Sequence, residues 1–219
     1  MHEVRRPTLH FSGLPSAAAE LKRSRSNDMN TIEAIHARRS IRAYRADPVE
    51  RTALEQIVWA AAQAPSPPIS GDKPWVFCVF EGIDAIDDLG VRAQQYAQAH
   101  HPAGRPWTWA DRREFRVFWG APALLLICAR SGNPETMQDC CRAGQNAMLA
   151  ACHLGLGSCW VGAPMPWLRS AGVADALGVT AGFEPAVAIV MGHAAESPRG
   201  QPRPSPVIEW RSAASARLP

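Results

Sequence analysis

The amino-acid sequence predicts a single α+β domain. Four short apolar runs fit buried strands, at residues 75–80, 121–129, 158–162 and 186–192. The helical segments between them do not alternate strictly with the strands, which favours an α+β fold over a doubly wound one. The 219 residues are 47% hydrophobic and 20% charged, a composition that excludes a fibre, a coiled coil and a wholly disordered chain.

Residues 1–28 differ from the rest of the chain. They show no hydrophobic period and are rich in Ser, Arg and Pro, so we expect a disordered extension followed by one domain at residues 29–219. The extension carries five basic and three acidic residues, whereas the remaining 18 basic and 17 acidic residues nearly cancel. A body so close to neutral gives no electrostatic reason to bind nucleic acid.

Two helix starts carry capping signals. Asn30 followed by Glu33 fits a capping box that begins a helix over residues 31–38. Further along, Asp47 is the expected N-cap of a second helix, with Pro48 at its first position. This second helix should end where a cluster of prolines follows, because proline cannot continue a helix.

The remaining elements follow from apolar periodicity and turn residues. We expect helices over residues 83–99, 139–154 and 167–177, and a long irregular loop over residues 100–110. The tail beyond residue 198 is rich in proline, so it cannot pair within a central strand.

Several classes of protein are excluded by what the sequence lacks. No apolar stretch reaches about 18 residues, so we expect no membrane span, and the N-terminus does not resemble a secretory signal. The six cysteines form no C-x-x-C pair, and we expect free thiols in a reducing cytoplasm and no metal site. The glycines of residues 155–162 have the wrong spacing for a dinucleotide-binding turn.

The strongest chemical signal is a basic cluster just after the first predicted helix. Arg38, Arg39 and Arg42 place three guanidinium groups within five residues, and Ser40 adds a hydroxyl. These cations could simply complement the carboxyl end of the helix. Adjacent guanidinium groups also repel one another unless an anion neutralises them, and a terminal phosphate does so through bidentate bonds. The charge pattern leaves both interpretations open.

The same cluster is the first part of a resemblance to the nitroreductase family of FMN-dependent oxidoreductases. Residues 38–44, Arg-Arg-Ser-Ile-Arg-Ala-Tyr, are followed by Asp-Pro-Val and a helix, as at the start of that family. Three further blocks match in the expected order, at residues 64–77, 141–162 and 186–203. The resemblance covers residues 30 to about 207.

The resemblance implies a nitroreductase-like fold, with a mainly antiparallel central sheet flanked by helices, assembled as an intertwined homodimer with FMN at the interface. In that family the first arginines, the serine and a C-terminal arginine hold the phosphate and ribityl groups. A short strand lies along the isoalloxazine ring, where backbone N–H groups approach N5 and O4. A Pro-Ser pair approaches the ring from its other side, often from the partner subunit. Carried over to this sequence, the cofactor-binding residues are Arg38, Arg39, Ser40, Arg42, Pro65, Ser66, Trp160, Val161, Gly162, Ala163 and Arg203.

The implied activity is hydride transfer from NADH or NADPH to a small planar acceptor, such as a nitroaromatic, a quinone or an enone, by a ping-pong mechanism. The flavin carries this chemistry, so we assign no catalytic side chain. We expect residues 96–119 to cover the flavin, with Trp107, Trp109 and Trp119 serving either as that cover or as core anchors.

Two alternatives stay open at this point. A specialised relative within the same family would fragment flavin with dioxygen, dehalogenate a substrate or dehydrogenate a peptide. A non-catalytic flavin-binding module would need the same arginine cluster but would show no turnover. A nucleic-acid-binding role for the basic extension has little support, because the rest of the chain is nearly neutral.

Overall fold

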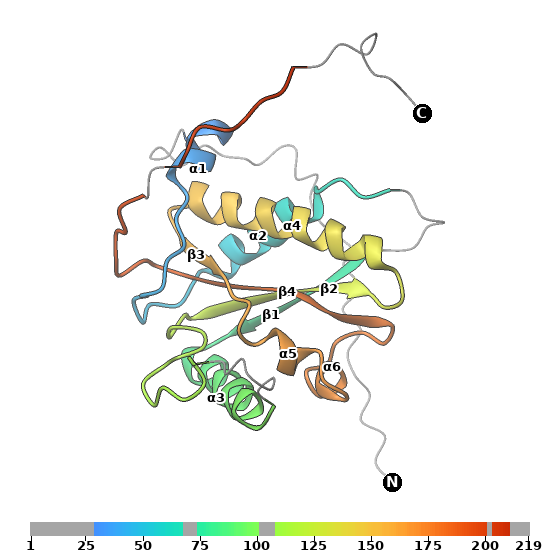
Figure 1. Cartoon of the computed structure of the whole chain (residues 1–219). Helices are drawn as coiled ribbons and strands as arrows, with labels where there is room; N and C mark the ends of the chain where they lie inside the picture. The colour runs from blue at the N-terminus through green and yellow to red at the C-terminus, as the bar shows by residue number, and fades with distance from the viewer. Residues whose placement is uncertain (1–28, 68–73, 101–107, 201–202, 211–219) are drawn as a thin grey trace.

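A computed structural model describes residues 29–67, 74–100, 108–200 and 203–210 (Figure 1). The extension over residues 1–28 lies outside the described residues, and its disorder stays a prediction. In chain order, the helices and strands are α1 (Thr31–Ala37), α2 (Arg51–Ala62), β1 (Trp75–Glu81), α3 (Ile83–Ala99), β2 (Ala123–Arg130), α4 (Pro134–His153), β3 (Gly157–Trp160), α5 (Met165–Leu168), α6 (Val173–Ala176) and β4 (Phe183–Gly192).

The strands form one sheet in the order β1-β2-β4-β3, and every neighbouring pair is antiparallel. β2 and β4 occupy the centre, where nearly every residue is buried on both faces. Apolar side chains at consecutive positions of these two strands therefore fill both faces of the sheet. The predicted α+β fold with a mainly antiparallel sheet is confirmed.

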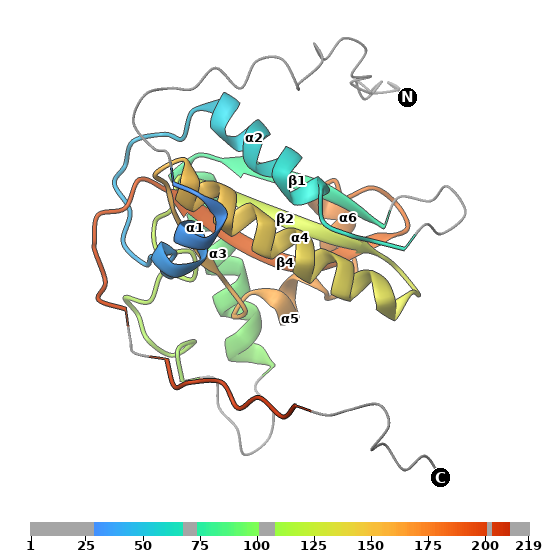
Figure 2. The same cartoon turned by 90° about the horizontal axis from the view of Figure 1, so that it is seen from above.

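Helices cover both faces of this sheet (Figures 1 and 2). On one face α2 and α4 pack over Leu125 and Ile127, and α1 lies against α4. On the other face α3, α5 and α6 pack over Leu124 and Leu126, together with the fully buried Phe118. Successive residues of β2 thus anchor two separate cores. In the described residues, no helix combines the length and apolar character needed to cross a membrane.

The first capping signal is confirmed and the second is wrong. The Asn30 side chain accepts the backbone N–H of Glu33, and the Glu33 carboxylate accepts that of Asn30. Asp47 does not cap α2, which begins later, at Arg51. The Asp47 carboxylate instead forms a 2.8 Å ion pair with Arg45. Burial of Val49 in the core keeps the intervening chain extended before the helix starts.

Two other helices differ from the predicted bounds. α4 begins five residues earlier than expected, because the Asn133 side chain caps it by accepting the Glu135 N–H at 3.0 Å, with Pro134 as the first helical residue. The helix expected over residues 167–177 is divided into α5 and α6. Gly172 lies between the two at a φ of 79°, a left-handed conformation that glycine adopts without strain.

Candidate functional site

The chain that follows α1 is extended and lies beside β3. Ser40 bridges to Ser158 in parallel, and the Ile41 N–H donates to the Ser158 carbonyl at 3.0 Å. The approach is close, since a Cβ atom added to Gly157 would lie only 2.9 Å from the Ile41 side chain. Glycine at position 157 therefore allows the basic segment to pack directly against the sheet.

Arg38, Ser40 and Arg42 alternate along this extended segment and converge on β3. Burial raises the pKa of the Cys159 thiol, while Arg42, a hydrogen bond from Ser40 and Arg38 act in the opposite direction. Burial likewise raises the pKa of Cys152, against the influence of Arg38 and Arg39. Both thiols thus face the guanidinium groups, which gather where α4 ends and β3 begins.

These guanidinium groups are not neutralised by carboxylates. Among the described residues, no ion pair involves Arg38, Arg39 or Arg42. The Arg39 side chain donates to the backbone carbonyls of His36 and Arg38, at 2.6 and 2.9 Å. The cluster therefore keeps a positive charge that an anionic group would neutralise.

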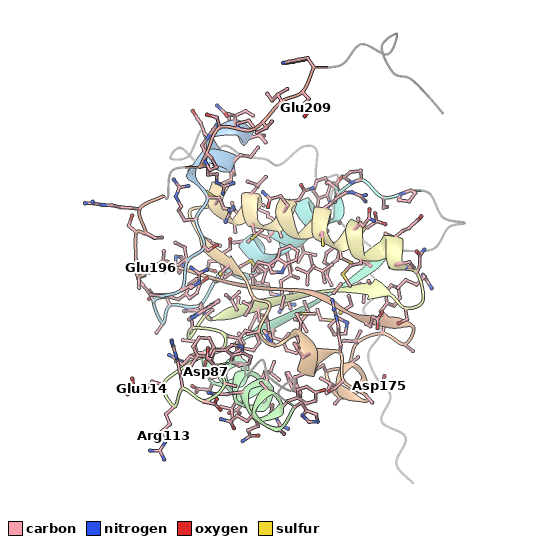
Figure 3. All side chains as sticks on the ribbon, in the orientation of Figure 1. Asp87, Arg113, Glu114, Asp175, Glu196 and Glu209 are labelled. Atoms are coloured by element: carbon pink, nitrogen blue, oxygen red, sulfur yellow. The ribbon has the colours of Figure 1, made fainter. Side chains whose placement is uncertain are left out.

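One carboxylate does touch the cluster, but through the backbone. Glu196 accepts the backbone N–H of Arg42 at 2.5 Å. Figure 3 shows Glu196 on the segment that follows β4, at one edge of the molecule. This bond ties the basic segment to the chain beyond the sheet and leaves the Arg42 guanidinium available.

The residues at the end of β3 offer a different chemistry. The Val161 N–H donates to the Ala188 carbonyl at 2.9 Å, so it belongs to the sheet and cannot meet a ligand. Gly162 is exposed, with no heavy atom within 4 Å of where a Cβ would lie. Within the described part of the chain, the N–H groups of Gly162 and Ala163 donate to no protein acceptor. Gly162 and Ala163 thus carry N–H groups that could donate to a ligand.

The cationic and N–H-donating parts of the site lie along one strand. Ser158 is beside the arginine segment, and Gly162 follows four residues later. Extended chain rises about 3.3 Å per residue, so the two parts are about 13 Å apart. Between them the Trp160 ring packs on α4, where a Cβ on Gly144 would lie 2.8 Å from it. This arrangement suits a molecule with an anionic tail and a flat, hydrogen-bond-accepting head.

Pro65 and Ser66 belong to the loop after α2, and this loop contacts a different part of α4. The Arg142 guanidinium donates to the Pro65 carbonyl at 3.3 Å and pairs with Asp139, whose carboxylate is buried. Arg142 is ten residues before Cys152 on α4, and therefore about 15 Å from the arginine end. Positions 142 and 144 also differ by about 200° around the helix. Within one chain, the Pro65 loop and Trp160 thus contact different sides of α4.

Arg203 lies three residues beyond Gly200, where an added Cβ atom would be 2.3 Å from the Arg39 guanidinium. It belongs to the segment 203–210, in which every residue is exposed. Figure 2 shows that this segment lies well away from α1. Among the described residues, no hydrogen bond or ion pair joins Arg203 to residues 38–42.

Sequence reasoning named Trp119 as either a cover for the flavin or a core anchor, but it missed the contact of Trp119 with Arg42. The Arg42 guanidinium lies over the Trp119 ring, 5.5 Å from its centroid, which sequence spacing could not indicate. Arg142 was also missed, although an Asp-x-x-Arg spacing on a helix predicts a contact between residues 139 and 142. In neither case does the sequence show what the arginine lies against.

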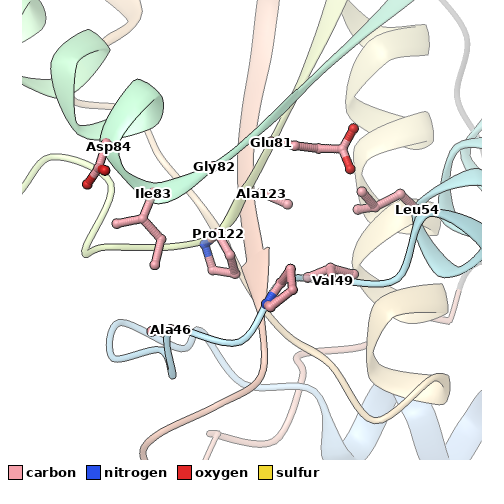
Figure 4. A pocket seen from close by; sticks show the side chains of 10 residues that line it. Ala46, Val49, Leu54, Glu81, Gly82, Ile83, Asp84, Pro122 and Ala123 are labelled. Atoms are coloured by element: carbon pink, nitrogen blue, oxygen red, sulfur yellow. The ribbon is translucent and has the colours of Figure 1, made fainter.

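A separate hollow of about 330 Å³ lies between the start of α2 and the end of β1 (Figure 4). Its lining is apolar except for two acids, Glu81 and Asp84. Glu81 forms a 3.1 Å ion pair with Arg51. Because the lining residues include no cation, this hollow does not suit an anionic ligand.

The fold defines an α+β class of protein, and the strip along β3 would suit a ligand with an anionic tail and a planar head. Comparison with known proteins agrees. The model of the nitroreductase family matches residues 35–193. The chain belongs to the nitroreductase family. The prediction of an oxidoreductase of this family is confirmed.

Individual relatives support the assignment. A Methanothermobacter thermautotrophicus protein, provisionally named NADH dehydrogenase/NAD(P)H nitroreductase, is 29% identical over 174 residues, which are 78% of this chain and 80% of that protein. A Bacteroides fragilis nitroreductase with bound FMN has a TM-score of 0.71 at 22% identity, covering 86% of this chain and 98% of that one. A Desulfovibrio desulfuricans protein in complex with FMN, provisionally named a nitroreductase, has a TM-score of 0.60 at 27% identity, covering 80% and 91%.

Proposed function

We propose that this protein is an FMN-dependent oxidoreductase that transfers hydride from NADH or NADPH to a small planar acceptor, such as a nitroaromatic, a quinone or an enone. The observation that carries the proposal is the cluster of Arg38, Arg39 and Arg42 beside β3, which has no ion-pairing carboxylate among the described residues. A phosphate monoester with about two negative charges would neutralise it. The FMN-bound structures of relatives support the same ligand.

The chain would bind and orient the cofactor rather than perform the chemistry. FMN, when bound, accepts hydride from the nicotinamide and delivers it to the acceptor. Arg38, Ser40 and Arg42 would hold the phosphate and ribityl groups. The N–H groups of Gly162 and Ala163 would donate to the ring edge where negative charge develops on reduction, as donors of an oxyanion hole do. This assignment needs no side chain as acid or base.

We also propose that the protein is a homodimer whose subunits share each site. Pro65 and Trp160 contact different sides of α4 in one chain, so Pro65 of the partner subunit would complete the ring pocket. α1 presents exposed Ile32 and Ile35, with 61% and 46% of their surface accessible. A second copy of the chain would cover these apolar side chains. Arg203 of the partner subunit would then join the phosphate site.

A reducing compartment suits this chain. All six cysteines are free thiols, and three of them (Cys128, Cys140 and Cys159) are buried. We therefore propose that the protein acts in the cytoplasm, where such thiols stay reduced.

The activity is tested by steady-state kinetics on the FMN-loaded protein. NADH and NADPH oxidation are each measured with and without a quinone. We expect quinone-dependent turnover with parallel lines in double-reciprocal plots, because donor and acceptor would use the same face of the flavin in turn. Intersecting lines would exclude the ping-pong mechanism. Bound FMN that neither nucleotide reduces would indicate a binding module, and turnover with dioxygen alone would indicate a specialised relative.

A further inference from the structure

Trp119 has a backbone conformation that its side chain disfavours. Its φ is 51°, and among the described residues it is the one non-glycine position with a positive φ. Gly120 follows at 66°. Side chains crowd the following carbonyl in this left-handed region, which glycine and asparagine tolerate far better than a bulky residue. Strain of this kind persists where the surroundings hold it and is concentrated at functional sites.

The conformation places the Trp119 ring beneath an arginine of the candidate site. The Arg42 guanidinium lies over the indole, 5.5 Å from the ring centroid, a distance at which a cation is attracted to the ring face. The preceding residue, Phe118, is fully buried in the core beneath the sheet. The left-handed turn thus allows Phe118 to stay in the core while the next side chain contacts Arg42.

The Trp119 turn is itself held in place. Its N–H donates to the Arg116 carbonyl at 3.1 Å. The Arg116 side chain pairs with Asp87 of α3 and fills the space beside Gly120, where a Cβ would lie 2.5 Å from its guanidinium. Gly120 is therefore required for this packing, and the ring rests on a turn that is fixed to α3.

Among the described residues, the other hydrogen bonds that hold this part of the chain are made by the backbone of Arg42 and of its neighbour. The Arg42 N–H donates to Glu196 at 2.5 Å, and the neighbouring Ile41 bonds to β3 through its N–H and to the Tyr44 hydroxyl through its carbonyl. Beyond the backbone, the long Arg42 side chain has several rotatable bonds. Stacking on a planar ring suits the flat guanidinium and limits this freedom.

We propose that Trp119 is a positioning residue for the cofactor site, which holds the Arg42 guanidinium in the orientation that the anionic tail of FMN requires. The inference rests on the proposed function, because it takes FMN as the partner of Arg42. Trp119 acts through Arg42 and does not itself contact the phosphate. It also links the loop before β2 to the cationic end of the site.

The test compares FMN affinity among position 119 variants of the full chain, measured by quenching of flavin fluorescence. Trp119→Leu removes the ring face and should raise the Kd for FMN about fivefold, whereas Trp119→Phe should retain most of the affinity. Trp119→Asn is a second non-aromatic variant, because asparagine tolerates the left-handed backbone at this position. It should show the same loss of FMN affinity as Trp119→Leu. Trp167→Leu, a change in the same core away from Arg42, is the matched control and should bind FMN as the unaltered chain does.

A double-mutant cycle separates positioning from general packing. With Arg42→Met in the background, Trp119→Leu should cause no further loss of affinity, because the group it positions is gone. An equal loss in both backgrounds, or unchanged affinity in both non-aromatic variants, would overturn the inference. If the unaltered chain binds no FMN, the proposed function fails instead. If it binds FMN and the variants bind equally well, only the role of Trp119 fails.

Discussion

Two segments carry the arginines that the family resemblance assigns to one phosphate site. The first segment is bonded to the sheet, whereas the second is exposed. Residues 38–42 are bonded to β3 and to Glu196, and Arg42, Ser40 and Arg38 oppose the rise in the pKa of Cys159 that burial causes. Residues 203–210 are exposed throughout, and Val207 and Trp210 have 92% and 90% of their surface accessible. The first segment is thus ordered by its own chain. The second has apolar side chains that a single chain leaves uncovered.

This contrast indicates which part of the site one chain can form. The arginines of residues 38–42 and the N–H donors after β3 belong to segments that hydrogen bonds tie to the sheet within one chain. In the proposed homodimer, Arg203 and Pro65 of the partner subunit would complete the site. We therefore expect the two groups of residues to respond differently to substitution and to dilution.

The largest effect is expected from the first segment. Replacing both Arg38 and Arg42 by alanine should raise the Kd for FMN about 100-fold or more, since a hydrogen bond to a charged group contributes about 1.5–3 kcal/mol. Arg51→Ala removes one guanidinium group from an exposed position on α2 and is the control. Fluorescence titration with FMN measures the Kd of both variants and of the unaltered chain. A double variant that binds as tightly as the control would contradict the assignment of this segment.

The role of the N–H groups after β3 is tested by adding a side chain at Gly162, which would occupy the space proposed for the flavin ring. Gly162→Val should weaken FMN binding about tenfold or more, because the added side chain would occupy the place assigned to the ring. The fold should tolerate it, since nothing lies within 4 Å of the Cβ position and its φ is not positive. Ala181→Val, in an exposed turn, is the control for stability and affinity. Tight FMN binding by the folded Gly162 variant would exclude this position for the ring.

For the second segment, residues 203–210, we expect a substitution to change the dissociation constant of the proposed dimer. Val207→Asp places a charge on a side chain that a single subunit exposes, so the fold should be unchanged. If this segment packs against a partner, the dimer dissociation constant should rise about tenfold, as for a loss of about 1.4 kcal/mol. Sedimentation velocity over a dilution series measures it. Val91→Asp, on the exposed side of α3, is the matched control and should leave the dimer intact.

The sequence predicts well the features that depend on near neighbours. The capping box of α1 needs only Asn30 and Glu33, and both bonds form. The apolar runs of the strands are equally local, because nearly every residue of β2 is buried whichever face of the sheet it points to. The four family blocks then supply the order of the elements and the main candidate residues.

Predictions fail where distant segments decide the outcome. Asp47 has an ideal sequence context for a cap, yet burial of Val49 delays the start of α2. α4 begins at the Asn133 cap, five residues before the predicted start, because the prediction depended on the apolar pattern further along the chain. The contact between Trp119 and Arg42 joins residues 77 positions apart through a left-handed turn, and no spacing rule indicates it.

The central claim is that guanidinium groups beside β3 bind the anionic tail of a flavin. The most direct measurement is the visible absorption spectrum of the purified protein, followed by titration with FMN. The account predicts the spectrum of a bound flavin, or saturable binding at micromolar FMN with one flavin for each chain. A colourless protein that binds no FMN at such concentrations would contradict it.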